Sequence, residues 1–296
     1  MGKRYKGIFA PLTTPFANED IYLEKFEDNI LRYNEFDLSG YVISGSTAES
    51  VYLSDDEIEK LVKAAIDASS PDKTIIAGTA RESTKITVEF SNRIADLGID
   101  AILIRTPSYF KALMTQEALK THYLTIADQA KVPLIIYHIP RYTGLTFTPE
   151  LLIELSKHER IAGIKDSSGN MGFLNRVIPL LDPSFDFLLG AGSMLYPGLM
   201  MGSSGGILAL ADIAPGQCVH LYKLFLEKRW DEAKKLQHDL VPLNQALTVE
   251  HGIPAIKYAL DLIGFYGGPC RLPLQDMTDR DKHKVRDVLK KIGLVT

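Results

Sequence analysis

The sequence GYVISGSTAESVYLSDDEIEKLVKAAI, residues 40–66, joins a short run of apolar and β-branched residues to an amphipathic helical pattern. Ser54 and Glu57 have the spacing of a capping box, which marks the start of a helix. After this start, apolar residues recur at helical spacing at Ile58, Leu61, Val62 and Ile66. The stretch therefore predicts one strand followed by one helix, the unit from which parallel α/β folds are built.

The same pattern of a strand-like run before a helical stretch occurs eight times in the chain. The other seven runs cover residues 7–16, 74–79, 101–107, 133–140, 161–168, 186–192 and 205–212. Thr148 followed by Pro149 marks a further helix start. Eight repeats over about 220 residues favour a closed TIM (β/α)8 barrel over an open sheet, which more often shows irregular strand order and a nucleotide-binding turn.

The remainder of the chain, from about Pro215, has only helical patterns. It holds the last barrel helix and then three further helices, expected around residues 230–248, 253–263 and 279–292. No linker rich in Gly, Pro or Ser separates these helices from the barrel. We expect a catalytic barrel over residues 1–227 and a C-terminal helical extension over residues 228–296 that packs on it.

Composition excludes several classes of function. The 296 residues carry a formal net charge of −4 and no block of like charges, so nucleic acid is not an expected partner. The two cysteines, Cys218 and Cys270, lie far apart, and the pattern indicates neither a disulfide framework nor a zinc site. No apolar run is long enough for a signal peptide or a membrane span. We expect a soluble cytoplasmic protein that does not bind membranes.

A lysine ends the sixth strand-like run. Active sites of TIM barrels lie at the C-terminal ends of the strands. Period-2 alternation places Ile161, Gly163 and Lys165 on one face, and Gly163 would leave room inside the barrel for a long side chain. Desolvation would lower the pKa of Lys165 and free its amine to attack a carbonyl. The alternative is a lysine that simply reaches solvent at a strand end.

Hydroxyl groups end two further strand-like runs. Tyr137 shares a face with Ile135 and Ile139, one strand before the lysine, and its phenol could relay protons with a partner such as Thr47. The loop after the second run contains Ser46 and Thr47 and could hold a substrate carboxylate. The alternatives are a core tyrosine with a satisfied hydroxyl and an ordinary Gly-Ser-Thr turn.

Four segments carry a resemblance to a known family. The runs GYVISGSTAES (40–50), RTPSYF (105–110), YHIPRYTG (137–144) and AGIKDSSGN (162–170) occur in the order and spacing of the dihydrodipicolinate synthase and N-acetylneuraminate lyase family, which the whole chain resembles. The resemblance implies a TIM barrel with a C-terminal helical extension, assembled as a homotetramer. It also implies that pyruvate or another 2-oxo acid is bound as an imine, without metal or cofactor.

The resemblance also implies roles for individual residues. Lys165 matches the imine-forming lysine, and Tyr137 matches the tyrosine that relays protons. Ser46 and Thr47 match the loop that binds the substrate carboxylate. The remaining matches are Tyr109, which family members lend to a neighbouring subunit's site, and Gly190 and Ile207, whose backbone lines the pocket.

Departures from the synthase pattern bear on the substrate. Synthases carry an arginine directly before the Thr-Gly of this motif, where this chain has Tyr142, with Arg141 one place earlier. The stretch HGIPAIKYALDLIGFYGGPCRLPLQ (251–275) looks like 4-hydroxy-2-oxoglutarate aldolase and the deoxy-sugar-acid aldolases. We therefore expect cleavage of a 4-hydroxy-2-oxo acid, such as 4-hydroxy-2-oxoglutarate or a 2-oxo-3-deoxy sugar acid, to pyruvate and an aldehyde. Arg141 would bind a distal carboxylate.

Three alternatives to this activity stay open. The first is 4-hydroxy-tetrahydrodipicolinate synthase, which condenses pyruvate with aspartate semialdehyde. The second is a sugar-acid-binding barrel without catalysis, which would need neither Lys165 nor Tyr137. The third, a metal-dependent aldolase or hydrolase, would need clustered ligands, whereas the seven histidines are scattered. His138 falls on the strand face opposite Tyr137, so we expect it to pack behind the site.

Overall fold

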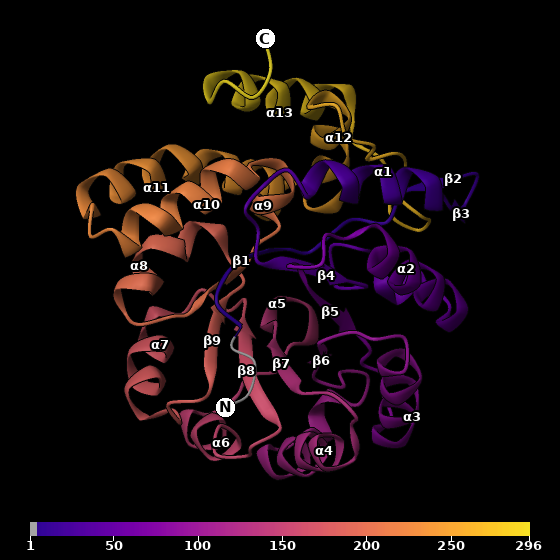
Figure 1. The fold of residues 1–296 in the computed structure, drawn as a ribbon, viewed down its shortest axis with the longest axis vertical. Coiled ribbons are helices and arrows are strands. Elements are labelled where there is room, and N and C mark those ends of the chain that lie inside the picture. Colours follow the sequence, from indigo (N-terminus) through magenta and orange to yellow (C-terminus); the bar gives the residue numbers. More distant parts are fainter. Residues whose placement is uncertain (1–4) are drawn as a thin grey trace.

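The computed structural model describes residues 5–296 and shows a closed barrel of eight parallel strands (Figure 1). The strands are β1 (Gly7–Ala10), β4 (Gly40–Ile43), β5 (Thr74–Gly78), β6 (Ala101–Arg105), β7 (Leu134–His138), β8 (Ile161–Asp166), β9 (Asp186–Leu189) and β10 (Gly205–Ile207). Each lies within one of the eight expected runs, and β1 closes the barrel by pairing with both β4 and β10. The predicted TIM barrel is confirmed. A small hairpin of β2 (Phe16–Ala17) and β3 (Asp20–Ile21) was not predicted.

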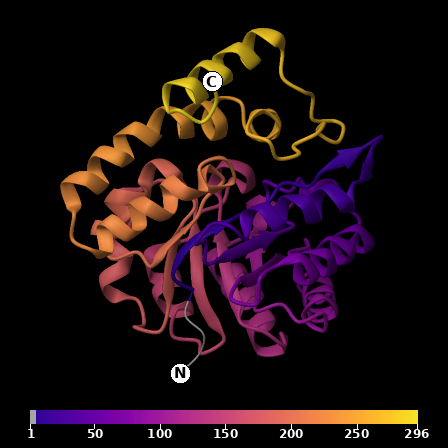
Figure 2. The same ribbon diagram turned by 45° about the horizontal axis from the view of Figure 1, so that its top comes forward.

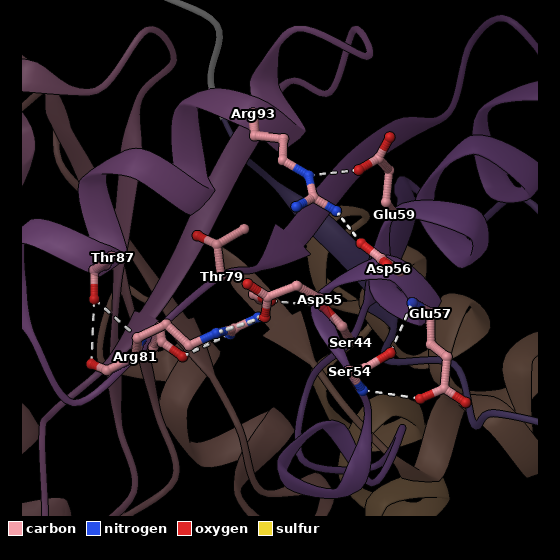
Figure 3. Close-up of polar contacts among 12 residues, drawn as sticks. Ser44, Ser54, Asp55, Asp56, Glu57, Glu59, Thr79, Arg81, Thr87 and Arg93 are labelled. Carbon is pink, nitrogen blue, oxygen red and sulfur yellow. Dashed lines mark hydrogen bonds and ion pairs between the residues drawn. The ribbon is translucent and has the colours of Figure 1, made fainter.

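Helices follow the strands, and most of them cover the outside of the barrel, whereas the short α5 lies at the carboxyl end of the strands (Figure 1). They are α1 (Leu23–Tyr33), α2 (Asp55–Ala68), α3 (Thr84–Ala95), α4 (Gln116–Gln129), α5 (Pro140–Thr143), α6 (Pro149–Leu155), α7 (Met171–Val177), α8 (Leu195–Met200), α9 (Leu210–Ile213) and α10 (Pro215–Leu226). The predicted capping box is present at the start of α2, where Ser54 and Glu57 bond each other's backbone N–H (Figure 3). Thr148 caps α6 as expected.

The C-terminal part of the chain forms the three further helices expected there. They are α11 (Trp230–Asn244), α12 (Ile253–Leu262) and α13 (Asp279–Lys291), and Figure 1 shows them gathered at one end of the molecule beside α1 and α10. The first differs from the prediction, because α-helical geometry ends at Asn244 and a π-helical turn follows over Gln245–Glu250. Such wide turns are uncommon and often occur at functional sites. No helix within residues 5–296 is long and apolar enough to cross a membrane.

Strand alternation divides the core into two layers. Residues that point inward fill the barrel, and residues that point outward pack against the helices. The inner layer consists of Tyr5, Phe9, Val42, Ile76, Ala101, Leu103, Ile135, Tyr137, Ile139, Leu188 and Ile207. The predicted grouping of Tyr137 with Ile135 and Ile139 on one face is therefore confirmed.

Strand β8 departs from the regular alternation that the sequence suggested. Leu134 pairs with Ile161, but the next residue, Ile135, pairs with Gly163, so β8 has one extra residue at this point. Ile161 consequently packs in the outer layer, and Ala162 contacts the inner one. The prediction that Ile161 shares a face with Lys165 is wrong for this reason.

Gly163 also has a different role from the one expected. A Cβ at this position would lie 2.3 Å from the backbone oxygen of Asp186 on β9. Glycine is required because two strands approach closely here, rather than to make room for the lysine side chain.

Candidate active site

Lys165 and Tyr137 lie side by side at the C-terminal ends of β8 and β7. The two residues are direct partners in the strand register. The Lys165 ammonium lies 4.3 Å from the centre of the Tyr137 ring, and the two residues are 3% and 6% exposed. Lys165 therefore does not reach bulk solvent, which excludes the alternative of a solvent-exposed lysine at a strand end. An amine and a phenol lie close together in a largely dehydrated position.

A buried carboxyl group, that of Asp212 on α9, interacts electrostatically with Lys165. Asp212 is fully buried, and its carboxylate oxygens have no hydrogen-bond partner among residues 5–296. Burial raises the pKa of Asp212 well above its usual range, and the positive charge of Lys165 opposes this rise only in part. Asp212 could not be identified from the sequence, because nothing in the local pattern of α9 indicates which way its one carboxylate points.

A cavity of about 180 Å³ opens at this end of the barrel and contains most of the expected site residues. The expected residues that line it are Ser46, Thr47, Tyr137, Arg141, Lys165 and Gly190. Ile207 is fully buried in the inner layer of the barrel and is not among the lining residues. One loop, one short helix and three strand ends thus converge on a single pocket.

The loop with Ser46 and Thr47 is held tightly against its neighbours. Ser44 adopts a left-handed conformation with φ of 51°, and its hydroxyl donates to the carbonyl of Gly78 at 2.6 Å. The hydroxyl of Thr14 donates to the carbonyl of Ala48 at 2.8 Å. These contacts place the loop on the rim of the cavity, where its N–H and hydroxyl groups can meet an anionic group.

Arg141 lies at the mouth of the cavity. Its guanidinium donates to the carbonyl oxygens of Thr248 and Val249, at 3.2 and 3.0 Å, within the π-helical turn. Tyr142 lies beside it, with the Arg141 guanidinium carbon 5.9 Å from the ring centre, and both residues line the pocket. Because an arginine has five N–H donors, Arg141 retains donors for a substrate group.

Several polar residues line the cavity that the sequence analysis did not single out. They are Ser167, Ser193, Asn244 and Thr248. Ser167 follows the lysine by two positions, so a search of the same strand end could have found it. Asn244 and Thr248 come from the end of α11 and the π-helical turn, and only the tertiary packing brings them to the pocket.

Tyr109 does not belong to this cavity within one chain. It is 80% exposed, and its ring packs edge-on against the ring of Phe110, which is 67% exposed. Its backbone N–H and that of Ser108 donate to Glu82, which also pairs with Arg105. Partial burial works to raise the pKa of Glu82, but these bonds outweigh it and hold the pKa below its ordinary value. The loop is therefore anchored while its aromatic tip faces outward.

A second cavity, of about 220 Å³, borders the first at Tyr137. It lies between the loop after β4 and the loop after β5, and its lining includes Arg81, Glu82 and Arg105. Figure 3 shows Arg81 reaching across to Asp55, at 2.5 Å, and Arg93 bridging Asp56 and Glu59. Ion pairs thus connect α2 to α3 and to the loop before α3 on this side of the site.

On the outer face of the same strands, His138 and Asp166 form a buried pair. The His138 Nδ1 and Asp166 Oδ1 atoms are 2.5 Å apart, and both side chains are almost fully buried. The Ser168 hydroxyl donates to the other carboxylate oxygen at 2.8 Å. His138 therefore lies behind the site, on the face that alternation predicted. Within residues 5–296, no group of three or more His, Cys, Asp or Glu residues is placed to hold a metal ion.

Comparison with known proteins gives a consistent result over the whole chain. The model of the dihydrodipicolinate synthetase family matches residues 4–292. The chain is 32% identical, over 99% of its length and 98% of the relative, to a 4-hydroxy-tetrahydrodipicolinate synthase of Methanothrix thermoacetophila. It is 33% identical, over 98% of its length and 99% of the relative, to the synthase of Methanosarcina barkeri.

Solved structures agree with these matches. A dihydrodipicolinate synthase from Thermotoga maritima superposes with a TM-score of 0.95 at 28% identity, covering 99% of this chain and 100% of that one. The chloride-inhibited synthase from Acinetobacter baumannii, solved in complex with pyruvate, gives 0.93 at 29% identity, covering 98% of this chain and 99% of that one.

These relatives carry the synthase name, so the comparisons support the synthase alternative better than the aldolase reading that the C-terminal stretch suggested. The resemblance inferred from the four motifs is confirmed, and with it a carbon–carbon lyase on a TIM barrel. The chain belongs to the dihydrodipicolinate synthetase family.

Proposed function

We propose that this protein is a pyruvate-dependent enzyme in which Lys165 forms an imine with the 2-oxo acid. The observation that carries the proposal is the buried Lys165 amine beside the Tyr137 phenol, at the base of a pocket rimmed by Ser46 and Thr47. A non-catalytic binding barrel would not need an amine in this dehydrated position. Family membership supports the same chemistry.

The reaction follows from these groups. The Lys165 amine adds to the C2 carbonyl of pyruvate, and loss of water leaves a protonated imine. This cation accepts the electron pair that is left when C3 loses a proton, and an enamine forms. Tyr137 moves protons between the substrate oxygen and the intermediates. Ser46 and Thr47 bind the pyruvate carboxylate, which orients C3 toward the open mouth of the pocket.

The first candidate for the second substrate is aspartate semialdehyde. The enamine carbon would attack the aldehyde of aspartate semialdehyde. The amino group of the same substrate would then displace Lys165 from the imine and close the ring, with one water released overall. This assignment rests on the full-length similarity to relatives named 4-hydroxy-tetrahydrodipicolinate synthase. Arg141, the one cation besides Lys165 among the residues described as lining the pocket, would bind the distal carboxylate.

A second candidate is cleavage of 4-hydroxy-2-oxoglutarate to pyruvate and glyoxylate. The observation that favours it is Tyr142, which stands where synthases carry arginine, while Arg141 is tied to the carbonyls of Thr248 and Val249. In this reaction the enamine would be the leaving group when the C3–C4 bond breaks. A sugar-derived substrate with an uncharged tail fits less well, because it offers no carboxylate to the remaining donors of Arg141.

Tyr109 supports assembly into an oligomer. Together with Phe110 and Leu113 it forms an exposed apolar surface beside the second cavity, with exposures of 80%, 67% and 69%. We propose a homotetramer in which Tyr109 completes the site of a neighbouring subunit. One structural neighbour is described as a monomeric dihydrodipicolinate synthase variant.

A panel assay distinguishes the two reactions. Purified enzyme would be given pyruvate with aspartate semialdehyde, and separately 4-hydroxy-2-oxoglutarate, at matched pH. A kcat/KM for the condensation at least tenfold above that for cleavage would support the synthase. The reverse ranking would assign the aldolase activity and leave the Lys165 chemistry in place.

A further inference from the structure

The loop that carries Ser46 and Thr47 ends at Glu49, which has an unusual conformation. Its φ is 58°, in the left-handed region that residues other than glycine rarely adopt. The residue is only 1% exposed, so a carboxylate is buried two positions after Thr47. A strained and buried acidic residue persists only where several surrounding contacts fix its conformation.

Its counter-ion is Lys257 on α12, in the C-terminal part of the chain. The Lys257 ammonium lies 2.6 Å from Glu49 Oε1 and donates to the carbonyl of Pro269, also at 2.6 Å. Both charged side chains are almost fully buried, at 1% and 0% exposure. Burial lowers the pKa of Lys257, and the nearby Glu49 carboxylate opposes this shift. The Phe16 ring lies 4.4 Å from the ammonium.

Arg271 makes the second connection to the same loop. Its backbone N–H donates to Glu49 Oε2 at 2.9 Å. Its guanidinium donates to the carbonyl of Tyr52 and forms a two-point contact with Glu57, the residue that caps α2. Figure 2 shows the yellow C-terminal segment passing over the indigo α1 and the β2–β3 hairpin, where Arg271 also bonds the carbonyl of Glu19.

The turn between Lys257 and Arg271 requires glycine. A Cβ on Gly267 would lie 1.9 Å from the carbonyl oxygen of Lys257, so the chain folds back directly against α12. This return brings the Arg271 backbone to one oxygen of Glu49 while Lys257 holds the other. The Gly-Gly-Pro-Cys-Arg segment therefore does more than end a helix.

We propose that Glu49, Lys257 and Arg271 are positioning residues for pyruvate binding, because they hold the Ser46–Thr47 loop in the conformation that meets the pyruvate carboxylate. Replacing a buried ion pair by apolar groups is often neutral for stability, so stability alone does not explain why both charges are buried here. The need to hold the loop in a single geometry does explain why both charges are buried. This inference rests on the proposed function, and it makes the C-terminal helices part of the pyruvate site.

The test compares Glu49→Gln, Lys257→Met and the double variant, with Lys131→Met as the control. Lys131 also forms a lysine–carboxylate pair, with Asp96, but on the surface and away from the pocket. The half-saturating pyruvate concentration for borohydride trapping would be measured for each, together with the melting temperature. Each single variant should raise the half-saturating concentration about tenfold, or ~1.4 kcal/mol. At saturating pyruvate, kcat and the KM for the second substrate should change little.

The double variant separates positioning from stability. Because it leaves no unpaired buried charge, its melting temperature should recover toward that of the unmodified protein, while the pyruvate requirement stays raised. Recovery of both together, or an unchanged pyruvate requirement in the folded single variants, would overturn the proposal. If the single variants do not fold, Arg271→Lys, which keeps the charge but loses the fork to Glu57, should still raise the pyruvate requirement, and an unchanged value would overturn the proposal.

The same measurement distinguishes this inference from the function on which it rests. Absence of any borohydride-stable pyruvate adduct in the unmodified protein would refute the imine chemistry itself. A normal adduct with unchanged pyruvate dependence in all three variants would refute only the positioning role.

Discussion

The two faces of the β7–β8 strand pair carry two pairs of side chains that the same register aligns but that differ in their bonding. On the inner face, Tyr137 and Lys165 lie together, and no hydrogen bond joins them within the described chain. On the outer face, one residue further along each strand, His138 and Asp166 are locked at 2.5 Å. In the outer pair both carboxylate oxygens of Asp166 have fixed partners, His138 and Ser168, whereas the inner pair keeps its reactive groups available. Strand alternation thus separates a structural bond from a reactive pair by one residue.

Replacing the phenol should break the inner pair with the largest effect on rate. Tyr137→Phe removes the proton relay but keeps the ring, so kcat should fall by about 10²- to 10⁴-fold. The adduct at Lys165 should still form, more slowly. Tyr123→Phe is a matched control, because its hydroxyl is also buried and bonds a backbone carbonyl, that of Ile104. Equal kcat values for the two variants would show that the Tyr137 hydroxyl has no chemical role.

Breaking the outer pair should change stability rather than chemistry. Asp166→Ala leaves His138 without its buried partner and should lower the free energy of unfolding by about 3 kcal/mol. Asp128→Ala removes a largely exposed carboxylate from the partly buried His158, at 3.1 Å, and should cost about 0–1 kcal/mol. Urea unfolding measures both. A loss in Asp166→Ala no greater than in the control would contradict the locking role.

Acid should destabilise the protein through another buried histidine. His122 bonds the hydroxyl of Thr84 instead of a carboxylate, and burial lowers its pKa to about 4. The unfolded chain binds this proton near its ordinary pKa of about 6.5, so the stability is fully present above that pH and is lost as the pH falls to about 4. The loss should reach about 3 kcal/mol. His122→Gln should flatten this pH dependence in urea unfolding, and an unchanged slope would exclude His122 as its source.

Substitution of Arg141 probes recognition of the second substrate at the mouth of the pocket, and it should have the smallest effect of these variants. If Arg141 binds the distal carboxylate, Arg141→Ala should raise the KM for the second substrate by about 10- to 100-fold, because a charge-assisted contact is worth ~1.5–3 kcal/mol. The KM for pyruvate and the yield of adduct should stay unchanged. Arg229→Ala, at an exposed arginine outside the pocket, serves as control. An unchanged KM for the second substrate would remove Arg141 from substrate recognition.

Local patterns predicted the barrel and the position of the central pair. Each strand lies within one of the expected runs, and alternation alone placed Tyr137 inward and His138 outward. The same rule failed at Ile161, because the extra residue in β8 depends on how that strand pairs with β7. Nothing local reveals such an irregularity.

Contacts between distant segments account for the rest of what was missed. Asn244 reaches the pocket only through the packing of α11, and Lys257 meets Glu49 only because α12 crosses the barrel end. Asp212 is polar in a fully buried helix, and its surroundings come from several elements. Tyr109 was identified by its motif, but within a single chain its side chain is 80% exposed and does not line the pocket.

Borohydride trapping tests the imine at the inner pair most directly. The protein would be incubated with pyruvate, reduced with borohydride, digested and analysed by mass spectrometry, with Lys165→Met as the matched variant. We expect one pyruvate-derived adduct per chain, on the peptide that contains Lys165, and none in the variant. An adduct on Lys257 or any other lysine, or full activity in Lys165→Met, would contradict the assignment of Lys165 as the nucleophile.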